Sequence, residues 1–131
     1  MKEKRKLKID RPLTEAELQL MTAIWILGPC TVKGVQTELA KEKELAYTSV
    51  ATFMKILETK GYLKSFKSDK AHTFESLISR EEYEKLSLGH MAENLFDGDH
   101  SMMVMKLLND SHLSKKDLEA IRKVLNSRLS T

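Results

Sequence analysis

Residues 45–63 read Leu45-Ala-Tyr-Thr-Ser-Val-Ala-Thr-Phe-Met-Lys-Ile-Leu-Glu-Thr-Lys-Gly61-Tyr-Leu, and this stretch decides the fold. At helical pitch it has two faces. One face is apolar, because Val50, Met54 and Leu57 recur at i, i+4 and i+7. The opposite face is slim and polar, and it consists of Thr48, Thr52, Lys55 and Thr59. We therefore expect a helix over about 47–60 that packs on one side and ends at Gly61.

The polar face of this helix suits a DNA groove. Short hydroxyl side chains approach phosphates and bases closely, and a face without carboxylates does not repel the phosphate backbone. An ordinary solvated helix has a similar polar face, so the pattern by itself leaves both interpretations open. The neighbouring elements favour the DNA interpretation.

The flanking sequence predicts two further helices before this one and a hairpin after it. The helices are expected over about 15–27 and 33–41, and the strands over about 62–66 and 71–77. Three helices followed by a hairpin are typical of a winged helix-turn-helix, in which the hairpin at 62–77 is the wing. The predicted fold class is thus mainly α with a small β-hairpin wing.

Three helix starts carry the same signal, a Ser or Thr followed three residues later by an acid. They lie at Thr14, Ser79 and Ser114. In the first of these helices, the residues expected on the buried face are Leu18, Met21 and Trp25.

The segment after residue 79 is expected to form helices over about 80–95, 101–108 and 115–129. Such short helices cannot bury all their apolar side chains in a core of their own. They either fold back on the first domain or pair with a second copy, and pairing is favoured because helix-turn-helix proteins commonly bind two half-sites as dimers. The residues predicted for dimerisation are Tyr83, Leu86, Met91, Leu95, Met103, Leu107, Leu118, Ile121, Leu125 and Leu129.

We expect the chain to consist of three parts, of which the first is set apart by its charge. Residues 1–11 form a basic flexible arm with six Lys or Arg against two acids, whereas residues 12–78 form the winged-helix DNA-binding domain. Residues 79–131 form the helical dimerisation domain. The arm is either a solvated tail or a source of phosphate contacts that do not depend on sequence.

The composition excludes several classes of protein. No apolar run approaches the ~20 residues of a membrane span, and no apolar segment follows the basic start as a secretory signal requires. The single cysteine, Cys30, excludes an intrachain disulfide and fits a reducing compartment. We therefore expect a cytoplasmic protein without a membrane partner.

Several segments resemble the BlaI/MecI/CopY family of bacterial penicillinase, methicillin-resistance and copper-responsive repressors. The resemblance covers about residues 12–128, and Ala46 to Thr52 with Gly61 is its most specific part. The matching segments are Leu13-Thr-Glu-Ala-Glu, Ile24-Trp25 with Gly28-Pro29, Val35, Leu45-Ala-Tyr-Thr-Ser-Val-Ala-Thr, Leu57-Glu-Thr-Lys-Gly61, Ile78-Ser-Arg-Glu-Glu-Tyr and Leu113-Ser-Lys-Lys-Asp-Leu.

The resemblance implies a homodimeric repressor that binds a dyad operator of double-stranded DNA. The helix at 47–60 would enter the major groove, and the wing would lie near phosphates. The DNA-binding residues expected from this match are Tyr47, Thr48, Ser49, Thr52, Lys55, Lys64, Lys67, Lys70 and His72. Periodicity independently predicts Thr48, Thr52 and Lys55, whereas Tyr47 and Ser49 rest on the resemblance.

The sequence departs from this family at two points that concern induction. The Asn-Phe bond that is cleaved in β-lactam-responsive members aligns with Lys106-Leu107 here, so a protease or antirepressor partner is not identified. The cysteine-rich C-terminal motif of the copper-responsive members is absent, because the chain ends Asn126-Ser-Arg-Leu-Ser-Thr131.

The remaining chemically active residues match no known catalytic or metal-binding pattern. Cys30, His72, His90, His100 and His112 do not have zinc-ligand spacing, and no cofactor motif is present. Cys30 is expected to be a small core residue, with redox modification of a partly exposed thiol as the alternative. The alternative to a repressor is a winged-helix module that binds protein and not DNA, because the charge of residues 12–79 is balanced. An enzyme is a distant third.

Overall fold

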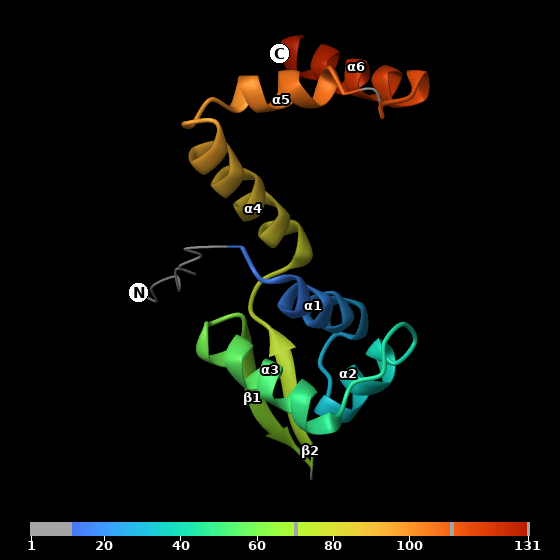
Figure 1. The fold of residues 1–131 in the computed structure, drawn as a ribbon, viewed down its shortest axis with the longest axis vertical. Helices are drawn as coiled ribbons and strands as arrows, with labels where there is room; N and C mark the ends of the chain where they lie inside the picture. Colours follow the sequence, from blue (N-terminus) through green and yellow to red (C-terminus); the bar gives the residue numbers. More distant parts are fainter. Residues whose placement is uncertain (1–11, 70, 111, 131) are drawn as a thin grey trace. The chain divides into compact units, whose positions relative to one another are not determined.

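The computed structural model of the chain describes residues 12–69, 71–110 and 112–130. It is mainly helical with one two-stranded antiparallel hairpin, so the predicted fold class is confirmed (Figure 1). The chain divides into two compact units, the first ending at His90 and the second beginning at Met91. In chain order the elements are α1 Glu15–Leu27, α2 Val32–Leu39, α3 Tyr47–Thr59, β1 Leu63–Ser68, β2 Ala71–Ser76, α4 Arg80–Leu95, α5 His100–Leu108 and α6 Lys115–Leu129.

The first unit is a winged helix-turn-helix in which α1, α2 and α3 are followed by the hairpin. The two strands pair from Leu63 opposite Ser76 to the turn end of the hairpin. Cys30 forms a short bridge to β2 before α2 begins. Its N–H donates to the carbonyl of Phe74 at 2.9 Å, and its carbonyl accepts from the N–H of Phe74 at 2.7 Å. This bridge fastens the wing to the loop between the first two helices.

The predicted helix starts are confirmed at all three positions. The hydroxyls of Thr14, Ser79 and Ser114 each accept from the N–H three residues further on, and the acid at that position accepts from the N–H of the capping residue. Each of these boxes satisfies two N–H groups that have no partner inside the helix. The start of α2 is capped by the hydroxyl of Thr31, and this helix begins and ends slightly earlier than predicted.

The core of the first unit confirms the apolar face of α3. Val50, Met54 and Leu57 are all 0 % exposed. On α1 the prediction for Leu18 was wrong, since this side chain is 37 % exposed and Leu20 is 1 % exposed instead. The buried stripe of α1 runs through positions 17, 20, 21 and 24. Because its first residue is an acid, the pattern of apolar residues does not reveal this face.

Tyr83 belongs to this core, which corrects its predicted place on a dimer surface. Its side chain is 6 % exposed, and its hydroxyl accepts the N–H of Leu13 at 2.8 Å. Its ring centroid lies 5.8 Å from that of Trp25. The first turns of α4 therefore pack with the winged helix, and the first compact unit extends to His90. The apolar period of α4 carries no information about which partner its tyrosine contacts.

The second unit contains the end of α4 together with α5 and α6. Ala92 and Met103 are its buried apolar residues, so Met103 is enclosed within the chain and not presented on the predicted dimer surface. No helix in the described part of the chain combines the length and apolar content that a bilayer span requires. The large apolar side chains that remain exposed from Leu95 onward are Leu95, Met102, Val104, Met105, Leu107, Leu118, Val124, Leu125 and Leu129.

Candidate nucleic-acid interface

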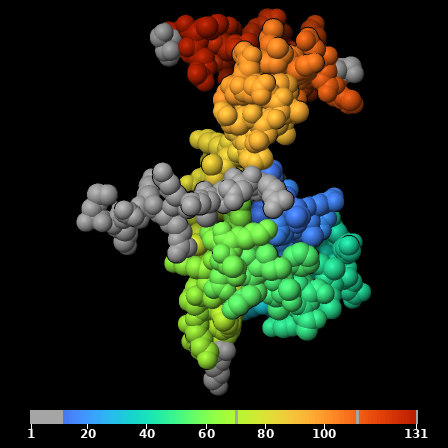
Figure 2. All heavy atoms as spheres, turned by 60° about the vertical axis from the view of Figure 1, so that its left-hand side comes forward, coloured from blue at the N-terminus to red at the C-terminus, as the bar shows by residue number. Residues whose placement is uncertain are grey.

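The candidate interface begins with α3, which lies at the surface of the first unit and is drawn in green in Figure 2. Its buried stripe fixes which side chains point outward. Tyr47, Thr48, Ser49, Thr52 and Lys55 are all exposed, and the side chain of Lys55 is 77 % exposed. The hydroxyl of Thr52 donates to the carbonyl of Thr48 at 2.9 Å, so its oxygen keeps lone pairs that can accept hydrogen bonds. Such a face accepts hydrogen bonds from bases and contacts thymine methyl groups.

The N-terminal end of α3 has no side-chain cap. Ala46 occupies the N-cap position with extended φ and ψ angles of −68° and 146°, and no acid follows in the first turn. Every other helix in residues 12–69, 71–110 and 112–130 starts with a capping Ser, Thr or Asp. An uncapped helix start presents its free N–H groups and its positive dipole end, which together bind phosphate.

The C-terminal end of α3 is closed by a Schellman motif. The N–H of Tyr62 donates to the carbonyl of Leu57 at 3.0 Å, and the N–H of Gly61 donates to that of Glu58 at 3.0 Å. The motif needs a left-handed residue, and Gly61 has a φ of 91°. Tyr62 is then 3 % exposed. The last turn of α3 is thus held by the core immediately before the wing begins.

Glu58 is the one acid on α3, and it lies beside the candidate face. One of its carboxylate oxygens is 4.0 Å from the ammonium nitrogen of Lys55. The other accepts the hydroxyl of Ser65 on β1 at 2.5 Å. Glu58 therefore links α3 to the base of the wing, whereas its contact with the exposed Lys55 is long. The spacing of Lys55 and Glu58 shows an i,i+3 pair, but the hydroxyl partner on β1 was missed because the strand register was unknown.

The wing residues Lys64, Lys67 and His72 are exposed, but they do not share one face of the hairpin. Lys67 pairs with His72 in the register, whereas Lys64 pairs with Glu75. Opposed residues lie on the same face and successive residues alternate, so Lys64 is on the other face from the first two. The ring of His72 stacks on Phe74 with centroids 5.2 Å apart. The ring of His72 therefore lies on the face of the hairpin that also carries the buried Phe74.

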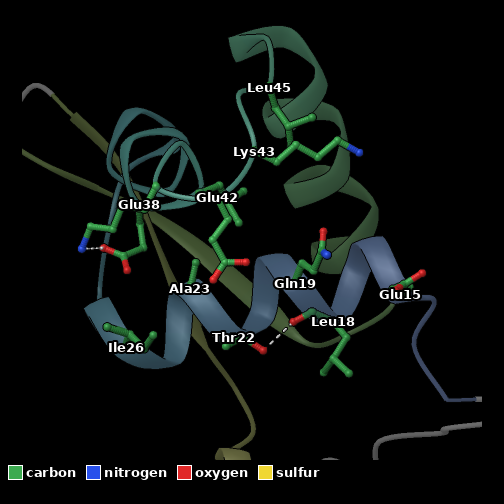
Figure 3. Close-up of a pocket in the computed structure, with 12 residues that line it drawn as sticks. Glu15, Leu18, Gln19, Thr22, Ala23, Ile26, Glu38, Glu42, Lys43 and Leu45 are labelled. Carbon is green, nitrogen blue, oxygen red and sulfur yellow. Dashed lines mark hydrogen bonds and ion pairs between the residues drawn. The ribbon is translucent and has the colours of Figure 1, made fainter.

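A groove of about 350 Å³ lies between α1 and the connector that precedes α3 (Figure 3). Its walls mix apolar side chains with three carboxylates, those of Glu15, Glu38 and Glu42. Two lysines, Lys41 and Lys43, also line the groove. The ammonium of Lys41 forms an ion pair with Glu38 at 3.0 Å. Carboxylates repel phosphate, so this groove does not belong to the nucleic-acid face.

Similarity to known proteins distinguishes among the three functions considered for this chain. The pattern of the penicillinase repressor family matches residues 13–127. The chain belongs to this family. Its members are DNA-binding transcriptional repressors and not enzymes, so the repressor is preferred to the enzyme and to the module that binds only protein.

Individual relatives of this repressor are distant in sequence but similar in length. The penicillinase repressor of Staphylococcus aureus is 24% identical over 114 residues, which cover 87% of this chain and 90% of the relative. The methicillin resistance regulatory protein MecI of Staphylococcus aureus (strain N315) is 20% identical, with 88% and 94% covered. A solved MarR family protein from Bacillus stearothermophilus has a TM-score of 0.50 at 13% identity and covers 92% of this chain and 76% of its own, which supports the winged fold.

For this repressor, the structure brings together the five residues predicted on α3 and separates those predicted on the wing. Lys70 and the basic arm at 1–11 lie outside the described residues. The features that the sequence did not predict are the uncapped start of α3 and the link from Glu58 to Ser65. The uncapped start could have been predicted, because Ala46 stands before α3 where the other helices have Ser, Thr or Asp.

Proposed function

We propose that this repressor binds a dyad operator as a homodimer, with α3 of each copy in the major groove and the wing against the adjacent backbone. The proposal is carried by α3, whose exposed hydroxyl face is held outward by three fully buried residues on its other side. The free N-terminal amides of α3 supply a phosphate site, while Thr48, Thr52 and Lys55 face the bases and backbone. A repressor of this kind acts in the cytoplasm.

The wing is proposed to add backbone contacts from its exposed lysines. Only one cation, Lys55, extends from the outward face of α3, so shape and hydroxyl contacts have to provide much of the fit in the groove. Lys64 and Lys67 lie on opposite faces of the hairpin and would reach different phosphates. Lys70 and the arm at 1–11 are proposed to add further contacts that do not depend on sequence.

The homodimer is supported by the second unit. A run of short helices exposes apolar side chains that range from 43 % for Leu118 to 79 % for Leu129. Monomeric globular proteins rarely expose large contiguous apolar patches, so we infer that these side chains form one surface that a second copy covers. Leu86, Met91, Leu95, Leu107, Leu118, Ile121, Leu125 and Leu129 remain the proposed dimer residues.

The DNA part of the proposal is tested by titrating the duplex upstream of the repressor's own gene at several salt concentrations. Specific binding that weakens steeply with salt is expected. Lys55→Glu should lower the affinity at least about tenfold, because a carboxylate at this position repels phosphate. Lys85→Glu is the control, since it reverses an exposed charge on α4. Absence of a specific complex for the wild type at moderate salt would instead favour the protein-binding module.

The dimer part is tested by sedimentation equilibrium. Leu125→Lys places a charge on the apolar side of α6, so the molar mass should fall toward that of one chain at micromolar concentration. Ser127→Lys introduces the same group on the opposite side of α6 and should leave the mass unchanged. Equal effects of both substitutions would show that this side of α6 does not form the interface.

A further inference from the structure

Glu17 is the one buried charged side chain among the residues that the structure describes, with 5 % of its surface exposed. It occupies the first position of the buried stripe of α1, where an apolar residue is expected. A charge in such a place is costly unless it is paired and hydrogen-bonded. The partners of Glu17 therefore indicate what it does.

The carboxylate of Glu17 has one partner nearby in the sequence and one far away. One carboxylate oxygen accepts the N–H of Thr14 at 3.0 Å and completes the capping box at the start of α1. The other accepts the ammonium group of Lys60 at 2.7 Å. Lys60 is the C-cap residue of α3, directly before Gly61. The carboxylate thus ties the first turn of α1 to the last turn of α3.

We propose that Glu17 and Lys60 are positioning residues, which set the orientation of α3 on α1 and thereby the affinity for the operator without contacting DNA. This inference rests on the proposed function. A hydrogen-bonded ion pair is directional, so it fixes the last turn of α3 relative to α1 more narrowly than non-directional apolar packing does by itself. The ammonium of Lys60 donates to Glu17 at 2.7 Å, and we therefore assign it to this pair and not to a phosphate contact.

The test compares three full-length variants: Glu17→Gln, Lys60→Met and the double variant. The amide oxygen of Gln still accepts the N–H of Thr14, so the capping box is kept while the ion pair is lost. Lys60→Met leaves a buried carboxylate without its partner and should be the least stable. The double variant removes both charges and should regain most of the lost stability.

Operator affinity is expected to behave differently from stability. It should fall about tenfold in the folded double variant, because the orientation of α3 is no longer fixed. Lys60→Arg should retain wild-type affinity, since a guanidinium donates the same hydrogen bond. The salt dependence should have the same slope in Lys60→Met as in the wild type, because no phosphate contact is lost.

Two results would overturn the inference while leaving the proposed function intact. The first is wild-type affinity in the folded double variant, which would make the pair purely stabilising. The second is a shallower salt slope for Lys60→Met, which would make Lys60 a phosphate contact. A wild type that forms no specific complex would overturn the proposed function together with this inference.

Discussion

The two ends of α3 differ in how the protein closes them. The end at Gly61 is closed by the Schellman motif, the buried ring of Tyr62 and the ion pair between Lys60 and Glu17. The end at Tyr47 has an alanine cap and no side-chain hydrogen bond. One end of the helix is therefore fixed by the protein, whereas the first N–H groups at the other end have no side-chain cap.

The largest contrast is expected from the two tyrosines that flank α3. Tyr62→Ala removes a ring that is 3 % exposed and should lower the free energy of unfolding by about 3–5 kcal/mol. Tyr47→Ala removes a ring that is 51 % exposed and should change it by less than about 0.5 kcal/mol. Urea unfolding measures both. Operator titration of Tyr47→Ala should show weaker binding despite the unchanged stability. Similar stability losses in both variants would contradict the contrast.

The next effect concerns the glycine of the closed end. Gly61→Ala forces a side chain into the left-handed region at φ 91° and should cost about 1–2 kcal/mol of stability. Gly89→Ala is the matched control, because Gly89 lies within α4 with nothing within 4 Å of an added Cβ. That substitution should stabilise the helix by up to about 1 kcal/mol. Thermal unfolding of the two variants should therefore shift in opposite directions.

At the Tyr47 end of α3, a side-chain cap should raise the stability of the protein and lower its affinity for the operator. Ala46→Ser and Ala46→Asp each place an acceptor at an N-cap that already has extended geometry, and each should stabilise the protein by about 1 kcal/mol. The aspartate also places a negative charge where phosphate is proposed to bind, so this variant should lose more operator affinity than the serine variant. If the aspartate variant binds as tightly as the wild type, the start of α3 does not contact phosphate.

The smallest effect is the pH dependence of stability that the ion pair between Glu17 and Lys60 contributes. Burial raises the pKa of Glu17, but the hydrogen bond and charge of Lys60 and the N–H of Thr14 outweigh it and leave the pKa below its ordinary value of 4.5. A lowered folded pKa adds stability that is present above 4.5 and is lost as the pH falls through the folded value. The stability difference between the wild type and Glu17→Gln should therefore shrink from pH 7 to pH 3. A difference that grows over this range would contradict the assigned pKa direction.

Local signals in the sequence predicted most of the first unit. Capping boxes, the apolar face of α3 and Gly61 each depend on neighbours within a few residues, so their geometry is contained in the local pattern. The face of α3 that carries Thr48, Thr52 and Lys55 followed from the same period. The errors arose where a residue contacts a distant partner. Tyr83 was misplaced because periodicity identifies a face but not what covers it, and Leu18 was misplaced because the buried acid Glu17 hides the apolar period of α1.

The sequence by itself determined a winged helix whose third helix has one buried and one hydroxyl-bearing face, since helical period and capping act over a single turn or two. The tertiary structure alone decided that Tyr83 completes the core of that domain, that the wing lysines lie on opposite faces, and that Glu17 reaches Lys60. These contacts depend on strand register and on how helices pack, and both are set by the whole core at once. No short stretch of the chain contains that information.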